Sequence, residues 1–434
     1  MKRINFLFVF VLAFALILSA CSSSGGSDKG TANKGNDKDS NSTSKEVTIV
    51  WAHGKDTTGA DQKAVEAFEK AHPNIHVKVQ EMPNDTGQQH DAYVTAFNAK
   101  SSSIDVINMD VIWPAEFAQA GYTLPLDRFI QQDNVDLSQY NQGALSAAQF
   151  NGKQWAMPLY VDAGLLFYRK DIVKEPPKTW DELIADAKKY QGKNGTKYGF
   201  VFQAKQYEGL VCNAVEYVTG YGGKFIDKDN NVVVNSPETI KGLNKMKEIA
   251  TSKFVPDNIT TFTEPETETA FIEGQAVFAR NWPYLWASSN DKEKSKVAGK
   301  VGVAPLPSGD NGSASALGGW MMGINKYSKH PKEAWEFVKF MTGPEGEKIQ
   351  AIAGGRAPVI NSLYQDEEVL NANPFFKEKG FQDAIANATS RPVAPNYQEI
   401  SNIIQIHVSK LLAGQESSEQ AVANMEKEMK AAQK

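Results

Sequence analysis

Strand-like and helical segments alternate in the stretch that follows residue 45. In chain order they are a strand at 46–51, a helix carrying Ala64, Val65 and Phe68, a strand at 75–80, a helix at 88–100 and a strand at 105–109. This alternation is typical of a parallel sheet whose strands are joined by crossover helices. In such sheets the functional loops lie beyond the carboxyl ends of the strands. The sequence therefore predicts an α/β fold with site residues that follow its strands.

Two tryptophans fall inside helices whose starts the sequence marks. Thr179 and Glu182 form a capping box around Trp180, and Pro331 stands at the first position of a helix that carries Trp335. Both helices are amphipathic, so we expect Trp180 and Trp335 to pack in the core.

The N-terminal segment has the pattern of an export signal. Lys2 and Arg3 precede an apolar run over residues 4–20, and small residues stand directly before Cys21. The run is too short and wrongly flanked for a stable membrane span, so it predicts a signal peptide at 1–20. The letters LSAC resemble the lipobox of bacterial lipoproteins, which implies that Cys21 is diacylated. The alternative is a buried helix with a chance cysteine.

Residues 21–45 predict a flexible tether behind the lipidated cysteine. After Cys21 they consist of small and polar residues with no aromatic or large aliphatic side chain, so they cannot offset the entropy of ordering. The other of the two cysteines, Cys212, lies in an apolar stretch. We expect it to be a buried small hydrophobe rather than a nucleophile.

Length and charge limit the function of the remaining stretch, 46–434. It is long enough for two lobes, and no second apolar run approaches a membrane span. The formal net charge of −5, with scattered lysines, argues against a nucleic-acid partner. The six histidines lack metal-ligand spacing, and no phosphate loop or Gly-x-Ser-x-Gly elbow is present. We therefore expect no metal, cofactor or catalytic residue, although composition alone does not separate a binder from a hydrolase.

A set of segments matches a known family over nearly the whole stretch after the tether. They are DVINMDVIW at 105–113, WAMPLYVDAGLLFYRKD at 155–171, TWDEL at 179–183, FIEGQAVF at 271–278, NWPY at 281–284, GGWMMGIN at 318–325, AWEFVKFM at 334–341 and SRPVAPNY at 390–397. Together they resemble the family 1 extracellular solute-binding proteins of bacterial ABC sugar importers. The similarity is to maltose-binding protein and above all to the trehalose/maltose-type members.

The resemblance implies a two-lobe periplasmic-binding-protein-like fold (type II, maltose-binding-protein-like) with three hinge crossovers and a ligand cleft between the lobes. The expected N-terminal lobe comprises 46–160 and 322–366, and the C-terminal lobe comprises 161–321 and 367–434. A hinge would close the lobes on a small oligosaccharide, and the closed form would dock on ABC permease subunits. The protein would be a monomer on the extracellular face of the cytoplasmic membrane, anchored through Cys21.

A sugar needs two kinds of partner, and the sequence offers both. Its hydroxyls suit carboxylate, amide and guanidinium groups, and its C–H patches suit aromatic rings. Asp110 follows an apolar strand end and is expected to accept hydrogen bonds from sugar hydroxyls; alternatively it caps the helix near Trp113. Tyr160 and Asp162 alternate along an extended crossover segment, which puts them on one face. The resemblance implies that both contact sugar, while hinge packing is the alternative for Tyr160.

Three aromatics stand at period two around Pro283, which excludes a helix interior or central strand there. The resemblance implies that Trp282 and Tyr284 face the sugar, whereas Trp286 is as well explained by the core. Trp320 follows Gly319, whose backbone can come close to a ligand, and is expected to stack on the sugar.

Further ligand residues are expected at Trp113, Arg391, Asn84 and Gln89. Arg391 matches an arginine that contacts sugar in trehalose/maltose-type members, and the alternative is a surface salt bridge. The loops at 52–59 and 84–89 follow predicted strands and are polar. Some family members carry an arginine where Gln89 stands and an acidic residue near Thr58, so this chain departs from them there.

Two other functions remain open on the sequence alone. A secreted lipoprotein glycosidase would need a carboxylate pair, for which Asp110 with Asp162, or Glu264, Glu266 and Glu268, are candidates. The other alternative is a binder of a different solute, such as a polyol or a glycosylated amine, on the same fold.

Overall fold

The computed structural model of the protein describes residues 46–392 and 396–433. The predicted signal peptide at 1–20, the lipidation of Cys21 and the tether at 21–45 lie outside these residues. Within the described part of the chain, no helix is both long enough and apolar enough to cross a membrane.

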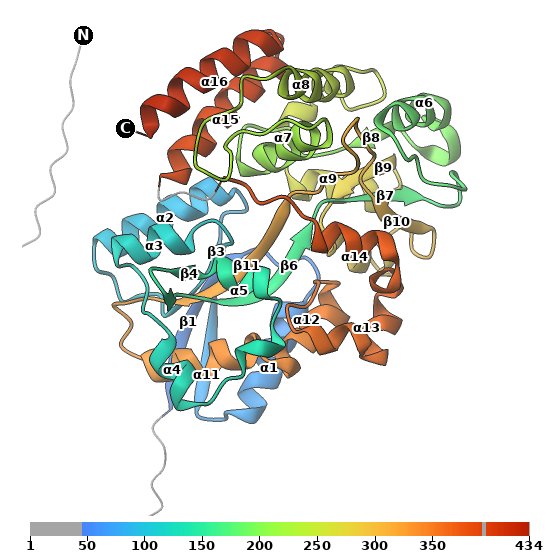
Figure 1. Cartoon of the computed structure of the whole chain (residues 1–434). Helices are drawn as coiled ribbons and strands as arrows, with labels where there is room; N and C mark the ends of the chain where they lie inside the picture. The colour runs from blue at the N-terminus through green and yellow to red at the C-terminus, as the bar shows by residue number, and fades with distance from the viewer. Residues whose placement is uncertain (1–45, 393–395, 434) are drawn as a thin grey trace, which may run out of the picture. The chain divides into compact units, whose positions relative to one another are not determined.

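The first of two main sheets has the strand order β2-β1-β3-β11-β6 (Figure 1). Its strands are β1 (Val47–Gly54), β2 (Ile75–Met82), β3 (Val106–Asp110), β6 (Met157–Ala163) and β11 (Leu317–Ile324). The strands β1, β2 and β3 are parallel and are joined by the helices α1 (Ala60–Ala71) and α2 (Thr86–Asn98). The predicted alternation after residue 45 is therefore confirmed. Strand β11 runs antiparallel to both β3 and β6.

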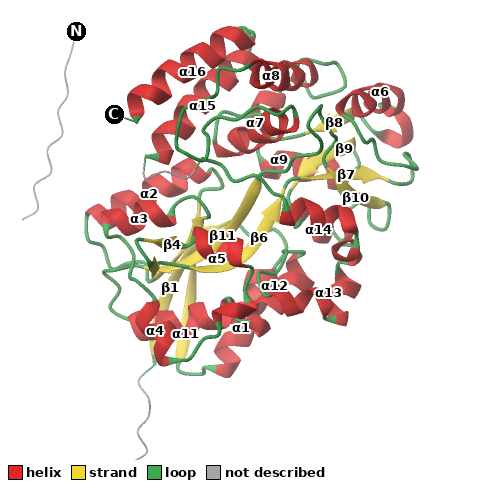
Figure 2. Cartoon of the chain, in the orientation of Figure 1, coloured by secondary structure: helices red, strands yellow, loops and turns green. Residues whose placement is uncertain are grey.

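The second sheet has the order β10-β7-β9-β8. Its strands are β7 (Leu165–Arg169), β8 (Tyr198–Val201), β9 (Ala276–Asn281) and β10 (Val301–Pro305). Helices surround its strands in Figure 2. They include α6 (Trp180–Tyr190), α7 (Glu208–Gly220), α8 (Pro237–Ala250), α9 (Glu264–Ile272), α15 (Tyr397–Leu412) and α16 (Ser418–Ala432).

Shorter elements complete the described chain. They are α3 (Pro114–Ala120), α4 (Asp127–Gln132), α5 (Gln142–Ala147), the hairpin strands β4 (Gln149–Phe150) and β5 (Lys153–Gln154), α10 (Leu285–Asn290), α11 (Pro331–Met341), α12 (Pro344–Gly354), α13 (Glu367–Ala372) and α14 (Lys379–Ala386). Helices α11 and α12 pack against α1, whereas α15 packs against α7.

The chain passes between the two sheets at short connections. Strand β6 ends at Ala163 in the first sheet, and β7 begins at Leu165 in the second. The return passage lies in residues 306–316, between β10 and β11. The lobe boundaries expected at 160/161 and 321/322 fall inside β6 and β11, because the pairing of these strands continues through those positions.

Core packing agrees with three predictions. Trp180 and Trp335 are each 2% exposed, and Cys212 is buried as a free thiol. The helix that carries Trp180 begins where predicted, since the Thr179 hydroxyl accepts a hydrogen bond from the Glu182 N–H at 3.2 Å. Burial raises the pKa of the Cys212 thiol, which disfavours its nucleophilic thiolate.

Candidate ligand-binding cavity

A row of three side chains crosses the first sheet. Trp320 on β11 pairs with Asp110 on β3 and with Tyr160 on β6. Directly opposed residues of neighbouring strands point to the same face, so the carboxylate and the two rings lie side by side. All three line one cavity, which also includes residues from α7, from α9 and from the segment after β9.

Two glycines before Trp320 allow this arrangement. Gly319 has φ 129°, a conformation that L side chains rarely adopt, and a Cβ there would lie 2.5 Å from the Tyr160 carbonyl oxygen. Next to it, Gly318 pairs with Asp162, and its missing side chain leaves room for the Trp282 ring. The strand then makes a register shift between Trp320 and Met321. Glycine at these two positions therefore lets backbone and ring approach each other at the cavity wall.

The opposite wall comes from the end of β9 and the start of α9. Trp282 and Tyr284 follow β9, and both rings are half-buried. Glu264 and Glu268 stand one helical turn apart on α9, so they point to the same side. The Glu264 carboxylate accepts hydrogen bonds from the Trp282 Nε1–H at 3.1 Å and from the Tyr207 hydroxyl at 2.7 Å.

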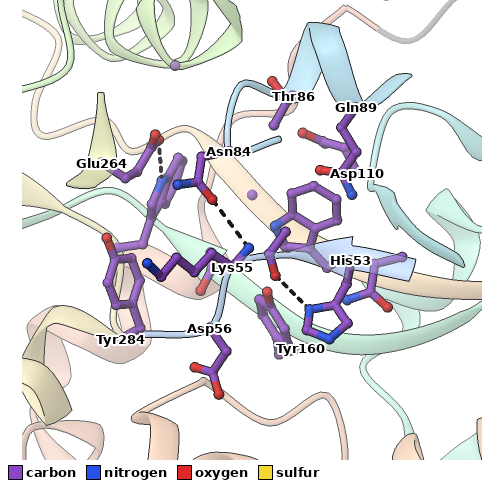
Figure 3. A pocket seen from close by; sticks show the side chains of 18 of the residues that line it. His53, Lys55, Asp56, Asn84, Thr86, Gln89, Asp110, Tyr160, Glu264 and Tyr284 are labelled. Atoms are coloured by element: carbon purple, nitrogen blue, oxygen red, sulfur yellow. Dashed lines mark hydrogen bonds between the residues drawn. The ribbon is translucent and has the colours of Figure 1, made fainter. Parts of the chain in front are cut away.

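The cavity brings together all of the predicted ligand residues except Trp113. They are Asn84, Gln89, Asp110, Tyr160, Asp162, Trp282, Tyr284, Gly319, Trp320 and Arg391. Figure 3 shows Asp110, Tyr160, Tyr284 and Glu264 around the same space. Carboxylates and aromatic rings thus share one lining, as recognition of a polyhydroxylated ligand requires.

Trp113 lies behind the cavity wall rather than on it. It is 2% exposed, stacks on Phe117 and meets Trp320 edge to face, with ring centres 5.8 Å apart in both pairs. Helix α3 begins at Pro114, directly after Trp113, and none of its residues lines the cavity. The position of Trp113 suits support of the Trp320 ring instead of direct contact with a ligand.

Arg391 joins the first-sheet side of the cavity to a helix of the second. Its guanidinium donates to Asp110 at 2.5 and 3.1 Å and to Glu208 at 2.9 Å, and Arg391 is 3% exposed. Glu208 also accepts hydrogen bonds from the hydroxyls of Tyr397 and Ser401. Arg391 therefore does form an ion pair, but the pair is buried, so the alternative of a surface salt bridge is wrong.

The alternative role of Asp110 as a helix cap finds little support. The residue directly before α3 is Trp113, which forms no side-chain cap, and the Asp110 carboxylate accepts a long, 3.4 Å hydrogen bond from the Ile112 N–H. Its two carboxylate oxygens are directed at Arg391 instead.

Asp162 is the most electrostatically perturbed carboxyl of the cavity wall. Burial raises its pKa to about 7, Arg356 and Arg280 oppose that rise, and the carboxylates of Asp110 and Glu264 add to it. Near neutral pH this group therefore exists in both its charged and its protonated form. A ligand that donates hydrogen bonds would favour the charged form.

Sequence reasoning missed a buried ion pair at the cavity floor. Arg356 donates to Asp61 at 2.5 and 3.2 Å, and its guanidinium lies over the Tyr160 ring. Burial raises the pKa of Asp61, but Arg356 and then His53 outweigh it and hold the pKa below its usual value. The His53 ring nitrogen Nε2 is buried and has no protein partner within the described chain. No local motif signals this group, because Arg356 and Asp61 are far apart in sequence.

The polar loops after β1 and β2 reach the cavity, as their position after strands predicts. Residues 54–58 line it, and Asn84 accepts a 3.2 Å hydrogen bond from the Lys55 N–H through its side-chain oxygen. Gln89 is 1% exposed and donates to the Tyr93 hydroxyl at 3.0 Å. Its amide is thus held by a helix neighbour at the edge of the site.

Further hydrogen bonds connect the two sides. The Thr57 hydroxyl donates to Glu268 at 3.1 Å, and Lys294 donates to the Thr57 carbonyl oxygen at 3.2 Å. Lys205 pairs with Asp85 at 3.0 Å. These contacts do not involve the rings or carboxylates of the central row.

The described residues contain no cluster of His, Cys, Asp or Glu arranged to hold a metal ion. Asp61 and Asp110 instead pair with arginines, and Glu264 accepts a hydrogen bond from a neutral donor.

The sequence matches the family of bacterial extracellular solute-binding proteins over residues 54–348. The chain belongs to this family. A probable ABC transporter-binding protein of Deinococcus radiodurans is 34% identical over 396 residues, which cover 88% of this chain and 92% of that protein. A maltotriose-binding protein of Pyrococcus abyssi is 31% identical over 312 residues, 69% of this chain and 64% of that protein.

The solved structure of maltose-bound T. maritima MalE3 is similar to this solute-binding protein along most of its length. The two chains are 38% identical with a TM-score of 0.84, over 89% of this chain and 99% of that one. The predicted two-lobe, maltose-binding-protein-like α/β fold is thereby confirmed.

Proposed function

We propose that this solute-binding protein captures a small oligosaccharide, with a glucose-containing disaccharide such as maltose or trehalose as the first choice. The lobes close on the sugar about the hinge, and the closed form delivers it to the permease of an ABC importer. Cys21 carries the lipid that keeps the protein on the extracellular face of the cytoplasmic membrane.

The row Asp110–Trp320–Tyr160, opposed by Trp282 and Tyr284, is the observation that carries this proposal. A sugar carries many hydroxyl groups that donate hydrogen bonds, and the carboxylates of Asp110 and Asp162 can accept them. Aromatic rings bury the C–H faces of a pyranose at little cost in side-chain entropy. Rings on both walls suit a ligand with two flat faces.

The relatives support the choice of sugar. A structure that is 38% identical holds maltose, and a relative that is 31% identical is a maltotriose-binding protein. An α-linked glucose oligomer is therefore the ligand to test first.

A thermal-shift screen followed by product analysis tests the proposal. We expect the melting temperature to rise with one or more of maltose, trehalose and maltotriose, and the sugar to be recovered intact. Released monosaccharide would instead favour the glycosidase. A shift with a polyol and none with any oligosaccharide would favour another solute on the same fold.

A further inference from the structure

The Trp282 indole is fixed from three directions. Its Nε1–H donates to Glu264 at 3.1 Å, which sets the rotation of the ring in its plane. The Arg280 guanidinium carbon lies 3.9 Å from the ring centre and covers one face. The far edge of the ring lies against Gly318, where a Cβ would be 3.0 Å from the ring. One face of the indole is thus occupied by a cation.

Arg280 cannot easily leave this position. It is 1% exposed and forms an ion pair with Glu216, which is 2% exposed, and it donates to the Gln203 side-chain oxygen at 3.1 Å. Gln203 donates back to the Arg280 carbonyl oxygen at 3.1 Å and to Thr267 on α9 at 2.8 Å. The charge behind the indole is therefore part of a connected buried network.

Glu264 is held as firmly on the other side. It occupies the first position of α9, which is started by a capping box between Thr263 and Glu266. Its second oxygen accepts the 2.7 Å hydrogen bond from Tyr207, which is 3% exposed. Both carboxylate oxygens of Glu264 therefore have protein donors, and one of these donors is the Trp282 indole itself.

We infer that Glu264 and Arg280 are positioning residues that hold the Trp282 indole in its stacking orientation before any ligand arrives. The inference rests on the proposed function, in which Trp282 stacks on sugar. A ring that is already ordered loses no rotamer freedom when a ligand binds. If Glu264 or Arg280 is replaced, the ring becomes mobile and affinity falls, even though every group that contacts the sugar is still present.

Fluorine NMR of protein labelled with 5-fluorotryptophan measures the ring directly. The chain has eight tryptophans, and Trp282→Phe identifies the Trp282 resonance by its disappearance. In Glu264→Leu without sugar, we expect this resonance to broaden or shift while the other tryptophan resonances keep their positions. Glu264→Gln retains an acceptor oxygen for the indole N–H and should restore the native resonance.

Affinity for maltose, or for the sugar that gives the largest thermal shift, is the second readout. Glu264→Leu should weaken it about tenfold, Glu264→Gln less than threefold, and Arg280→Lys by an intermediate factor, because lysine keeps the charge but not the planar cover. Glu273→Leu is the matched control, since Glu273 lies at the other end of α9 and pairs with Lys296 at the surface.

The outcomes separate the inference from the proposed function. An unchanged Trp282 resonance in Glu264→Leu, or affinity lost equally in Glu264→Gln and Glu264→Leu, overturns the positioning role. Unchanged affinity in Trp282→Ala overturns instead the stacking role on which it rests. Displacement of all tryptophan resonances in Glu264→Leu would mean general unfolding, and Glu264→Gln and Arg280→Lys then decide the question.

Discussion

Trp320 and Asp110 face each other across β11 and β3, so an aromatic ring and a carboxylate stand next to each other on one sheet face. The ring is supported from behind by Trp113, and the carboxylate is held by Arg391. Both side chains are therefore held by protein neighbours, and preorganisation of this kind favours tight binding.

Replacing Trp320 removes the stacking surface while leaving the carboxylates in place. We expect Trp320→Ala to weaken maltose binding at least tenfold. A tenfold change in affinity corresponds to roughly 1.4 kcal/mol, and the burial of one aromatic side chain contributes at least this much. Isothermal titration calorimetry measures the change. Trp155→Ala serves as control, because Trp155 is a half-buried tryptophan that does not line the cavity. Equal affinity in Trp320→Ala and the native protein would place Trp320 outside the site.

Asp162→Asn tests whether that side chain serves the ligand or the fold. The amide keeps the shape but loses an acceptor, so sugar affinity should fall about tenfold. At pH 5, where Asp162 is protonated in the folded protein, Asp162→Asn should not lower the melting temperature without sugar. A large loss of melting temperature at that pH would indicate a structural role in the hinge.

The raised pKa of Asp162, about 7, sets the pH dependence of stability. The native state holds this proton more tightly than the unfolded state, so its stabilising contribution is complete below pH 3.8 and is lost as pH rises through 7. Without sugar, Asp162→Asn should therefore melt above the native protein at pH 8. The melting temperature of Asp162→Asn minus that of the native protein should therefore increase from pH 5 to pH 8. A decrease over this range would contradict the raised pKa of Asp162.

Sugar binding should depend on pH in the opposite sense. If the charged form accepts hydroxyl donors, affinity rises about tenfold between pH 6 and pH 8, in proportion to the ionised fraction. Calorimetric titrations at several pH values measure the slope. Asp162→Asn should give a flat profile.

Removal of Arg391 breaks a buried ion pair. Arg391→Met leaves the carboxylates of Asp110 and Glu208 without their cation, which should lower the free energy of unfolding by about 3–5 kcal/mol. Urea denaturation without sugar measures this loss. Lys241→Met is the control, because its pair with Asp310 is exposed at the surface and should contribute less than about 1 kcal/mol.

Cys21→Ala tests the predicted lipid anchor. Without the thiol the protein should appear in the medium or remain unprocessed, because one diacylated cysteine is the expected membrane attachment. Fractionation of cells that express the variant measures this. Processed Cys21→Ala protein that stayed with the membrane would contradict the lipobox interpretation.

The sequence predicted the strands and helices after residue 45 because their apolar periodicity is local. It also singled out Trp282 and Trp320, which line the cavity, since a proline and glycines mark their positions. The same reasoning could not find Arg356, which meets Asp61 only through the fold, nor the burial of Arg391. It included Trp113 among the ligand residues, but the fold buries this ring against Trp320 and Phe117.

The hydrogen bonds between Thr57 and Glu268 and between Asp85 and Lys205 have a consequence for release. Under the proposed capture mechanism, they must separate before a bound sugar can leave, although no sugar need touch them. How long a sugar stays would then depend partly on residues outside the row Asp110–Trp320–Tyr160. Because the Asp85–Lys205 pair is partly exposed, dissolved salt would shorten that residence time without altering any group that recognises the sugar.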